Sequence, residues 1–120
     1  MLNTLIIGAS LKEERYSNMA IRRLRASNFP VLAIGRTSGF VEDVEIKREP
    51  IIDVEVHTVS LYLNKIAQEI YYDYIINLKP KRIIFNPGTE NPVLAKLCNE
   101  ASIEVLHACT LVMLSTKNYH

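Results

Sequence analysis

The sequence is short of the features that place a chain in several large classes of protein. It has only two cysteines, Cys98 and Cys109, and Cys98 falls on the apolar face of a predicted helix, so we expect no structural disulfide. Its three histidines, His57, His107 and His120, are scattered without a zinc-type spacing. The formal net charge is +1, which provides no strong field to attract nucleic acid or a membrane surface. We therefore expect a chain that binds neither.

Long hydrophobic runs are also missing. No segment approaches the ~18 apolar residues of a membrane span. No basic leader precedes Leu5-Ile6-Ile7, and charged residues 12–15 follow closely, so we expect no secretory signal. With so little cysteine, the cytoplasm is the predicted location. The 120 residues, 48% of them hydrophobic, suffice for one domain over residues 1–120 with its own core.

The most informative stretch of the chain is residues 4–17. The apolar run Leu5-Ile6-Ile7 suits a strand that is buried on both faces of a parallel sheet. Gly8-Ala9-Ser10 ends this strand, and after a polar loop a helix is predicted from Ser17, its N-cap, to Asn28, which takes the left-handed position at its end. Such a turn points backbone N–H groups and a helix N-terminus at one place, where phosphate binds.

The rest of the chain continues this alternation. Further strands are predicted at 30–34, 56–63, 82–85 and 103–107. A helix over 64–78 is expected to bury Ile66, Ile70, Tyr74 and Leu78. A second helix begins at Pro92, with Asn91 as its N-cap. Residues 37–54 favour a hairpin or a loop with an edge strand. Residues 108–116 fit either a short helix or a continued strand.

These elements predict a single Rossmann-like α/β domain. Its sheet would have five mainly parallel strands in the order 3-2-1-4-5, with helices on both faces. Ligands of such sheets bind outside the carboxyl ends of the strands, here at the switch between strands one and four. The segments that follow the strands are therefore expected at one edge: 8–10, 35–36, 62–64, 86–91 and 109.

The first turn is a poor dinucleotide fingerprint. The full motif needs three glycines, but only Gly8 is present, and Ser10 stands where the second would be. A plain structural turn is the alternative. Gly8-Ala9-Ser10 also resembles half of a hydrolase nucleophile elbow. However, Lys12 replaces its second glycine, and no acid follows in the right order to join His107.

The end of the second strand carries more information. NAD sites place an acid there, whereas sites for a ribose phosphate place an arginine. This chain has Gly35-Arg36 and no acid before Glu42, which favours NADP or coenzyme A over NAD. The alternative is that Arg36 is an ordinary solvated charge.

Two later features, the turn 86–91 and Cys109, each have a ligand-binding and a purely structural interpretation. Gly88 in the turn 86–91 would let the backbone approach a ligand, and Thr89 offers a polar group, but the turn also serves to start a helix. Cys109, after the last strand, either meets the thiol end of coenzyme A or is a small buried hydrophobe.

Taken together, these pieces resemble the small stand-alone CoA-binding domain proteins, which are similar to the N-terminal domain of the succinyl-CoA synthetase alpha subunit. The matching segments cover nearly the whole chain: Ile7-Gly8-Ala9-Ser10, Arg15-Tyr16-Ser17, Pro30-Val31-Leu32-Ala33-Ile34, Val59-Ser60-Leu61-Tyr62, Phe85-Asn86-Pro87-Gly88-Thr89-Glu90-Asn91 and Cys109. The chain departs from the family at Gly35-Arg36, where members commonly have Asn-Pro, and at Ala108, where they often have Arg.

The resemblance implies a coenzyme A site along the carboxyl edge of the sheet. Gly8, Ala9, Ser10 and Ser17 would hold the pyrophosphate. Arg36 would lie near the adenosine phosphate, and Tyr62 near the adenine or its ribose. The turn 86–91 would line the path of the pantetheine. The complete predicted ligand set is Gly8, Ala9, Ser10, Tyr16, Ser17, Gly35, Arg36, Tyr62, Asn86, Pro87, Gly88, Thr89, Asn91 and Cys109.

The favoured function is therefore binding of coenzyme A or acyl-CoA, without catalytic machinery of its own. One alternative is an NADP-binding oxidoreductase-type domain, although 120 residues leave no room for a substrate domain. The other is a non-catalytic interaction module with a vestigial nucleotide pocket. The predicted partner is a small nucleotide ligand in each reading except the last.

Overall fold

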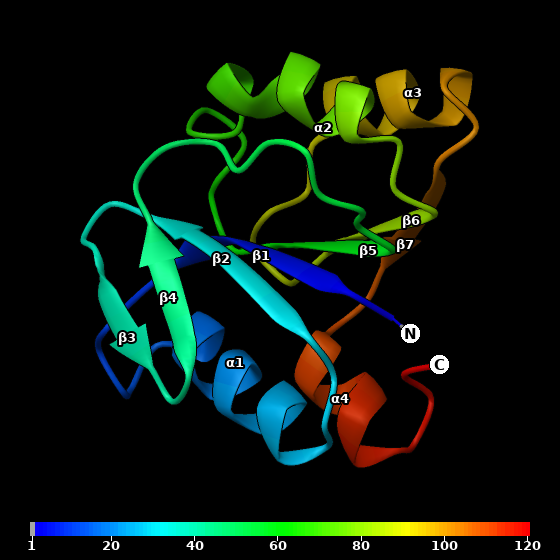
Figure 1. The fold of residues 1–120 in the computed structure, drawn as a ribbon. Coiled ribbons are helices and arrows are strands. Elements are labelled where there is room, and N and C mark those ends of the chain that lie inside the picture. Colours follow the sequence, from blue (N-terminus) through cyan, green and yellow to red (C-terminus); the bar gives the residue numbers. More distant parts are fainter. Residues whose placement is uncertain (1) are drawn as a thin grey trace.

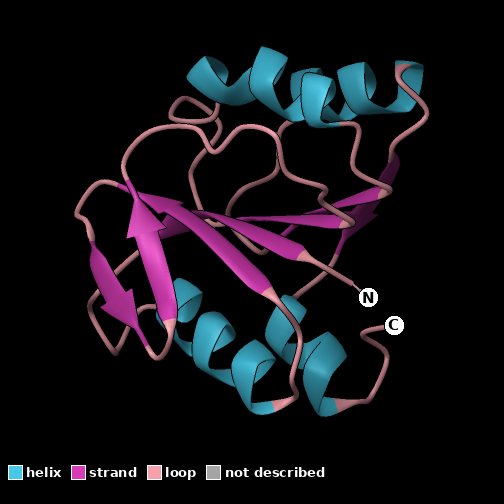
Figure 2. Cartoon of the chain, viewed as in Figure 1, coloured by secondary structure: helices cyan, strands magenta, loops and turns pink. Residues whose placement is uncertain are grey.

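Seven strands form one sheet, and helices cover both of its faces (Figures 1 and 2). The computed structural model describes residues 2–120. The strands are β1 (Thr4–Ala9), β2 (Val31–Gly35), β3 (Gly39–Val41), β4 (Val44–Lys47), β5 (Thr58–Leu61), β6 (Arg82–Phe85) and β7 (Glu104–His107). The helices are α1 (Tyr16–Ala26), the 3-10 helix η1 (Glu69–Tyr71), α2 (Tyr72–Leu78), α3 (Pro92–Glu100) and α4 (Thr110–Ser115).

The sheet confirms the Rossmann-like α/β class but not the predicted strand order. The order is β3-β4-β2-β1-β5-β6-β7, and every neighbouring pair is parallel except the hairpin β3–β4. The prediction of five strands in the order 3-2-1-4-5 was therefore wrong. The predicted strand 56–63, which is β5, lies between β1 and β6 rather than outside β2. β2, β4 and β3 therefore lie on one side of β1, and β5, β6 and β7 on the other, so the order of the strands reverses between β1 and β5.

Burial explains this difference. All four residues of β5 are buried, so the strand needs a neighbour on each side and a helix layer on each face. In contrast, β4 alternates buried and exposed residues, as suits a strand near the edge. The hairpin expected within 37–54 is confirmed, and it occupies the place beside β2 that the prediction gave to the third strand.

Each face of the sheet has its own hydrophobic core. One core packs Leu5, Ile7, Ile75, Phe85 and Leu94 beneath α2 and α3. The other packs Ile6, Ala20, Leu24, Ile46 and Ile84 against α1 and α4. In Figure 2, α2 and α3 lie on one side of the magenta strands, and α1 and α4 on the other. Because successive residues of a strand point to opposite faces, β1 contributes to both cores and lies at the centre of the molecule.

The predicted helix over 64–78 is the second correction. Only 72–78 are α-helical, after a turn over 65–68 and η1. Ile66 and Ile70, expected inside, are 72% and 82% exposed, whereas Ile75 is fully buried. The side chain of Gln68 accounts for this, because its amide donates to the carbonyl oxygens of Leu63 and Thr89 at 2.8 Å. These bonds place the side chain of Gln68 inside the protein, so Ile66 and Ile70 face the solvent.

The remaining helix ends follow the sequence more closely. α1 begins at Tyr16, with Arg15 rather than Ser17 as its N-cap. Asn28 has a φ of 64°, which confirms the left-handed position expected at the end of that helix. Asn91 caps α3 and Pro92 is its first residue, as predicted. Residues 110–115 are helical, which settles the ambiguity at the end of the chain.

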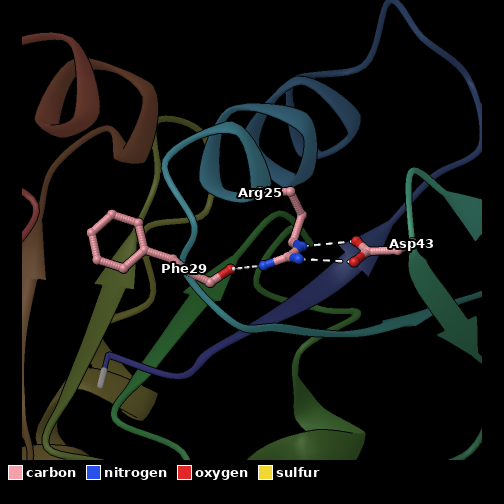
Figure 3. A network of polar contacts seen from close by, with 3 residues as sticks. All are labelled: Arg25, Phe29 and Asp43. Atoms are coloured by element: carbon pink, nitrogen blue, oxygen red, sulfur yellow. Dashed lines mark hydrogen bonds and ion pairs between the residues drawn. The ribbon is translucent and has the colours of Figure 1, made fainter.

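One ion pair joins α1 to the outer hairpin. Arg25 donates to both carboxylate oxygens of Asp43 at 2.8 Å and to the carbonyl oxygen of Phe29 at 2.9 Å. Figure 3 shows the guanidinium between these two partners. The bonds raise the pKa of Arg25 and lower the pKa of Asp43. They fix the turn between β3 and β4 to the end of α1.

Candidate functional site

The strand-end segments predicted from the sequence do meet at one edge of the sheet. The register of the parallel pairs places residues 8–10, after β1, between residues 35–36, after β2, and residue 62, after β5. The turn 86–91 follows β6, and Cys109 lies just beyond β7. The candidate site is therefore a row of segments in the order β2, β1, β5, β6, β7. It is centred on the reversal between β1 and β5, not on the predicted switch.

Two of the predicted ligand glycines are required by the contact between strands. Gly8 has a φ of 96°, and a Cβ there would come within 2.9 Å of the backbone carbon of Tyr62. A Cβ on Gly35 would come within 2.3 Å of the carbonyl oxygen of Ala9. The pairing of β1 with β2 shifts in register between Ile7 and Ala9. These glycines permit close packing of three strand ends, which is the structural reading of the first turn.

The loop after β1 is held in place by α1. The hydroxyl of Ser10 accepts a hydrogen bond from the backbone N–H of Lys12 at 3.1 Å. The side-chain amide of Asn18 donates to the carbonyl oxygen of Ser10 at 2.9 Å. Arg22 in turn donates to Asn18 at 2.8 Å and to the carbonyl oxygen of Glu13 at 3.0 Å. The sequence analysis did not predict this role of Asn18. The one indication in the sequence was its place as a polar residue on the inward face of the predicted helix.

The start of α1 offers an open site for an anion. Its N-cap, Arg15, makes no side-chain cap, and its first turn holds no acidic residue. Backbone N–H groups at such a helix start attract negative charge. Lys12 and Arg15 are exposed beside it, while Ser17 is buried and Tyr16 is 70% exposed. The N-terminus of α1 thus lies after the end of β1 with two cations, Lys12 and Arg15, and two acids, Glu13 and Glu14, exposed beside it.

The start of α3 is closed by comparison. The side-chain oxygen of Asn91 accepts from the backbone N–H groups of Val93 and Leu94 at 3.1 Å, and Pro92 has no N–H to offer. Both carboxylate oxygens of Glu90 lie 3.1 Å from the backbone nitrogen of Gly88. The backbone N–H groups of Gly88, Val93 and Leu94 therefore already have acceptors within the turn. Its Gly88 has a φ of 89° and open space where a Cβ would stand, so a ligand can approach the backbone there.

Asn86 connects three elements beneath this edge. Its amide nitrogen donates to the hydroxyl of Ser60 and to the carbonyl oxygen of Leu61, both at 2.8 Å. Its amide oxygen accepts from the backbone N–H of Thr110 at 2.8 Å, and the hydroxyls of Ser60 and Thr110 are 2.9 Å apart. Every hydrogen-bonding atom of this buried side chain is used. Asn86 consequently positions β5, β6 and α4.

A second buried amide supports the turn 86–91. Asn91 donates to the side-chain oxygen of Gln68 and to the hydroxyl of Tyr72, both at 2.9 Å. The Thr89 hydroxyl donates to the carbonyl oxygen of Asn86 at 2.7 Å. With the bond from Gln68 to Thr89 described above, this network makes the turn rigid. Within it, Pro87 and Gly88 are exposed, whereas Asn86, Thr89 and Asn91 are buried.

Tyr62 lies in the predicted row, but its hydroxyl points into the molecule. The hydroxyl is fully buried and has no hydrogen-bond partner within residues 2–120, and the ring packs against the core of α1 and α4. Burial raises the pKa of Tyr62 to about 12, although the hydroxyls of Ser60 and Thr110 act in the opposite direction. The hydroxyl is therefore not exposed at the candidate edge.

The remaining predicted residues differ in surroundings. Arg36 is exposed at the end of β2 and has no ion-pair partner among residues 2–120. Cys109 is half-buried and forms the N-cap of α4. Cys98 is fully buried, which raises the pKa of its thiol to about 11. Both thiols are free, so the structure holds no disulfide between them.

Outside the candidate site, the described residues form two cavities, but they contain no cluster of metal ligands and no helix that could span a membrane. Two cavities of about 300 and 420 Å³ lie at the amino ends of the strands, opposite the candidate site, and share Lys79 and Lys81. In the described part of the chain, no three or more His, Cys, Asp or Glu residues gather as a metal site would need. Residues 2–120 contain no helix with the length and apolar character to cross a membrane.

Comparison with solved structures finds the same fold repeatedly. A crystal structure of an uncharacterized protein is 43% identical with a TM-score of 0.94, covering 99% of this chain and 98% of that one. A Thermus thermophilus protein, cell-free ID.343, is 18% identical with a TM-score of 0.83, over 98% of this chain and 90% of the other. An acetyl-coenzyme A synthetase from Candidatus Korarchaeum cryptofilum is 14% identical with a TM-score of 0.73, over 89% of this chain and 25% of that one.

Comparison with sequence families assigns the chain more directly. A search of curated proteins finds no match. The sequence model of the CoA binding domain matches residues 3–115, which includes every element from β1 to α4. Its span contains the uncapped start of α1, the row of strand ends and the turn 86–91. This chain belongs to the CoA binding domain family.

Proposed function

We propose that this protein binds coenzyme A or its thioesters along the carboxyl edge of the sheet, and that binding, not catalysis, is its role. The open N-terminus of α1 carries the proposal. It lies beside the end of β1 with Lys12 and Arg15 exposed nearby, in a chain whose family is defined by CoA binding. The pyrophosphate of coenzyme A carries the charge that such a helix start favours.

The unequal helix starts give the ligand a direction. Phosphates would lie at the β1 and β2 end, where α1 is open and Arg36 is free to meet the adenosine phosphate. The uncharged pantetheine would pass the ring of Tyr62 towards Gly88, because the start of α3 is already capped. Ser10 and Ser17 remain the proposed pyrophosphate contacts. Gly8 and Gly35 would contribute only through their backbone.

A thermal-shift titration tests this function. Coenzyme A, dephospho-coenzyme A, NADP and NAD are compared at matched concentrations. A ligand that binds only the folded state must raise the melting temperature, so we expect the largest rise with coenzyme A. A rise with NADP alone would support an oxidoreductase-type domain instead. No rise with any of the four at high concentration would refute nucleotide binding.

Arg36 distinguishes coenzyme A from its dephosphorylated form. A hydrogen bond to a charged group contributes about 1.5–3 kcal/mol, so Arg36→Ala should weaken the binding of coenzyme A by about 10- to 100-fold and that of dephospho-coenzyme A much less. Lys81→Ala, at the opposite edge of the sheet, is the matched control. Equal losses for the two ligands would show that Arg36 does not contact the adenosine phosphate.

A further inference from the structure

Glu90 places a fixed negative charge at the far end of the candidate site. Both of its carboxylate oxygens lie 3.1 Å from the backbone nitrogen of Gly88, although the side chain is exposed. Backbone hydrogen bonds from Glu90 itself and from Gly88 lower the pKa of this carboxyl, and His107 acts in the same direction. The carboxylate is thus ionised and held at the tip of the turn.

The two ends of the edge therefore have opposite character. The exposed charges around β1 and β2 are Lys12, Glu13, Glu14, Arg15 and Arg36, three cations and two acids, whereas the turn after β6 carries Glu90 and no Lys or Arg. Lys65, in the segment that Gln68 ties to this turn, forms no ion pair with Glu90 in the described part of the chain. β1 and β6 are two strands apart, about 10 Å. A ligand that puts its phosphates at α1 brings its other end towards Glu90.

The backbone N–H groups of Gly88, Val93 and Leu94 already have acceptors within the protein. Glu90 already accepts from Gly88, and Asn91 accepts from Val93 and Leu94. A carboxylate on the ligand would find no free donor from these groups, and it would face a like charge. An uncharged acyl group meets neither difficulty, and Gly88 leaves it open space.

We infer that Glu90 determines the charge of the acyl group that this protein accepts, favouring thioesters of coenzyme A with uncharged acyl groups over those that carry a carboxylate. The inference rests on the proposed function, since it takes coenzyme A to be the ligand. It assigns Glu90 a role in specificity rather than in catalysis.

Propionyl-CoA and malonyl-CoA provide a matched pair, because both acyl groups have three carbons and only malonyl ends in a carboxylate. Two unit charges about 6 Å apart in water repel enough to change an equilibrium about threefold. We expect wild-type protein to bind propionyl-CoA at least threefold more tightly in isothermal titration. The preference should shrink as salt is added, since the charges are exposed.

The Glu90→Gln variant is the decisive comparison. Its amide oxygen can still accept from Gly88, so the turn is preserved while the charge is lost, and the preference should fall to about one. Glu100→Gln, at the other end of α3, should leave the preference unchanged. If Glu90→Gln keeps the wild-type ratio, or if wild type shows no preference, the inference is wrong while the proposed function stands. If wild type binds neither these thioesters nor coenzyme A, both fail.

Discussion

At the residue scale, the polar side chains of the candidate edge divide into those that build it and those that are free to meet a ligand. Asn86, Gln68 and Asn91 are buried and spend their hydrogen bonds within the protein. Arg36 and Glu90 are exposed. The sequence placed Asn86 and Asn91 at strand ends, but a strand-end position does not reveal where a side-chain amide finds its partners.

Tyr62 gives a residue-scale prediction about pH. Burial raises the pKa of Tyr62 to about 12, so the folded state favours the neutral phenol. This contribution to stability is complete below the pKa of an unfolded tyrosine, about 10. It is lost as the pH rises through the pKa of Tyr62 in the folded protein. Tyr62→Phe removes a buried hydroxyl without a partner, so we expect the free energy of unfolding at pH 7 to stay equal or rise by up to about 1 kcal/mol.

Urea unfolding of both proteins between pH 7 and 11 measures this. Wild type should lose more stability than Tyr62→Phe above pH 10, so the difference between them should grow there. Tyr16→Phe is the control, since Tyr16 is mostly exposed. A marked loss of stability in Tyr62→Phe at pH 7 would mean that the hydroxyl has a partner, such as a buried water.

At the scale of elements, the outer hairpin β3–β4 is held by packing and by one exposed ion pair. β3 pairs only with β4, and Val41, Val44 and Ile46 of the hairpin are buried in the core of α1 and α4. The ion pair between Arg25 and Asp43 is a second tie to α1 (Figure 3). This hairpin leads from Arg36 to β4, so its position bears on the β2 end of the candidate site.

Asp43→Asn should loosen the hairpin without unfolding the protein. Exposed ion pairs contribute little to global stability, so we expect the melting temperature to be nearly unchanged and the amide exchange of β3 and β4 to accelerate. Because folding lowers the pKa of Asp43, the wild-type tie is present above the unfolded value of about 3.9 and is lost as pH falls through the folded value.

Hydrogen exchange followed by mass spectrometry reads out this loosening. Glu42→Gln is the matched control, because Glu42 occupies the same turn and makes no ion pair among the described residues. Unchanged exchange in Asp43→Asn would show that packing alone holds the hairpin.

At the scale of the whole molecule, the two ends of the described chain close the amino edge of the sheet. In Figure 1 the last residues of the chain lie beside the start of β1. The ring of Tyr119 is buried, stands edge-on to Phe29 with centroids 5.2 Å apart and lies 4.7 Å beneath the guanidinium of Arg82. Its hydroxyl is hydrogen-bonded to Thr4 in β1. Residues far apart in sequence thus cover the core of α1 and α4 at the amino ends of the strands.

Tyr119→Ala should destabilise the whole fold by about 3 kcal/mol, as expected for removing a buried aromatic ring. Tyr119→Phe keeps the ring and loses only the bond to Thr4, so about 1 kcal/mol is expected. Chemical denaturation gives both values. If Tyr119→Ala were as stable as wild type, the last residues would contribute nothing to the core.

The sequence by itself determined the class of fold, the parallel strands, the N-cap of α3, the left-handed Asn28 after α1 and the edge at which the strand-end segments meet. These follow from periodicity and from turn residues such as Gly8 and Asn91, which act within a few positions of the chain. It also gave the resemblance that the family match confirms.

Only the tertiary structure decided the strand order, the outward turn of Ile66 and Ile70, and which polar groups are already satisfied. Each depends on partners distant in sequence: β5 pairs with both β1 and β6 and is therefore buried, and Gln68 finds its acceptor at Thr89. The tertiary structure also decided that the start of α1 has no side-chain cap, whereas the start of α3 is capped by Asn91. Local patterns set what each segment can form, and burial together with hydrogen bonding selects its neighbours.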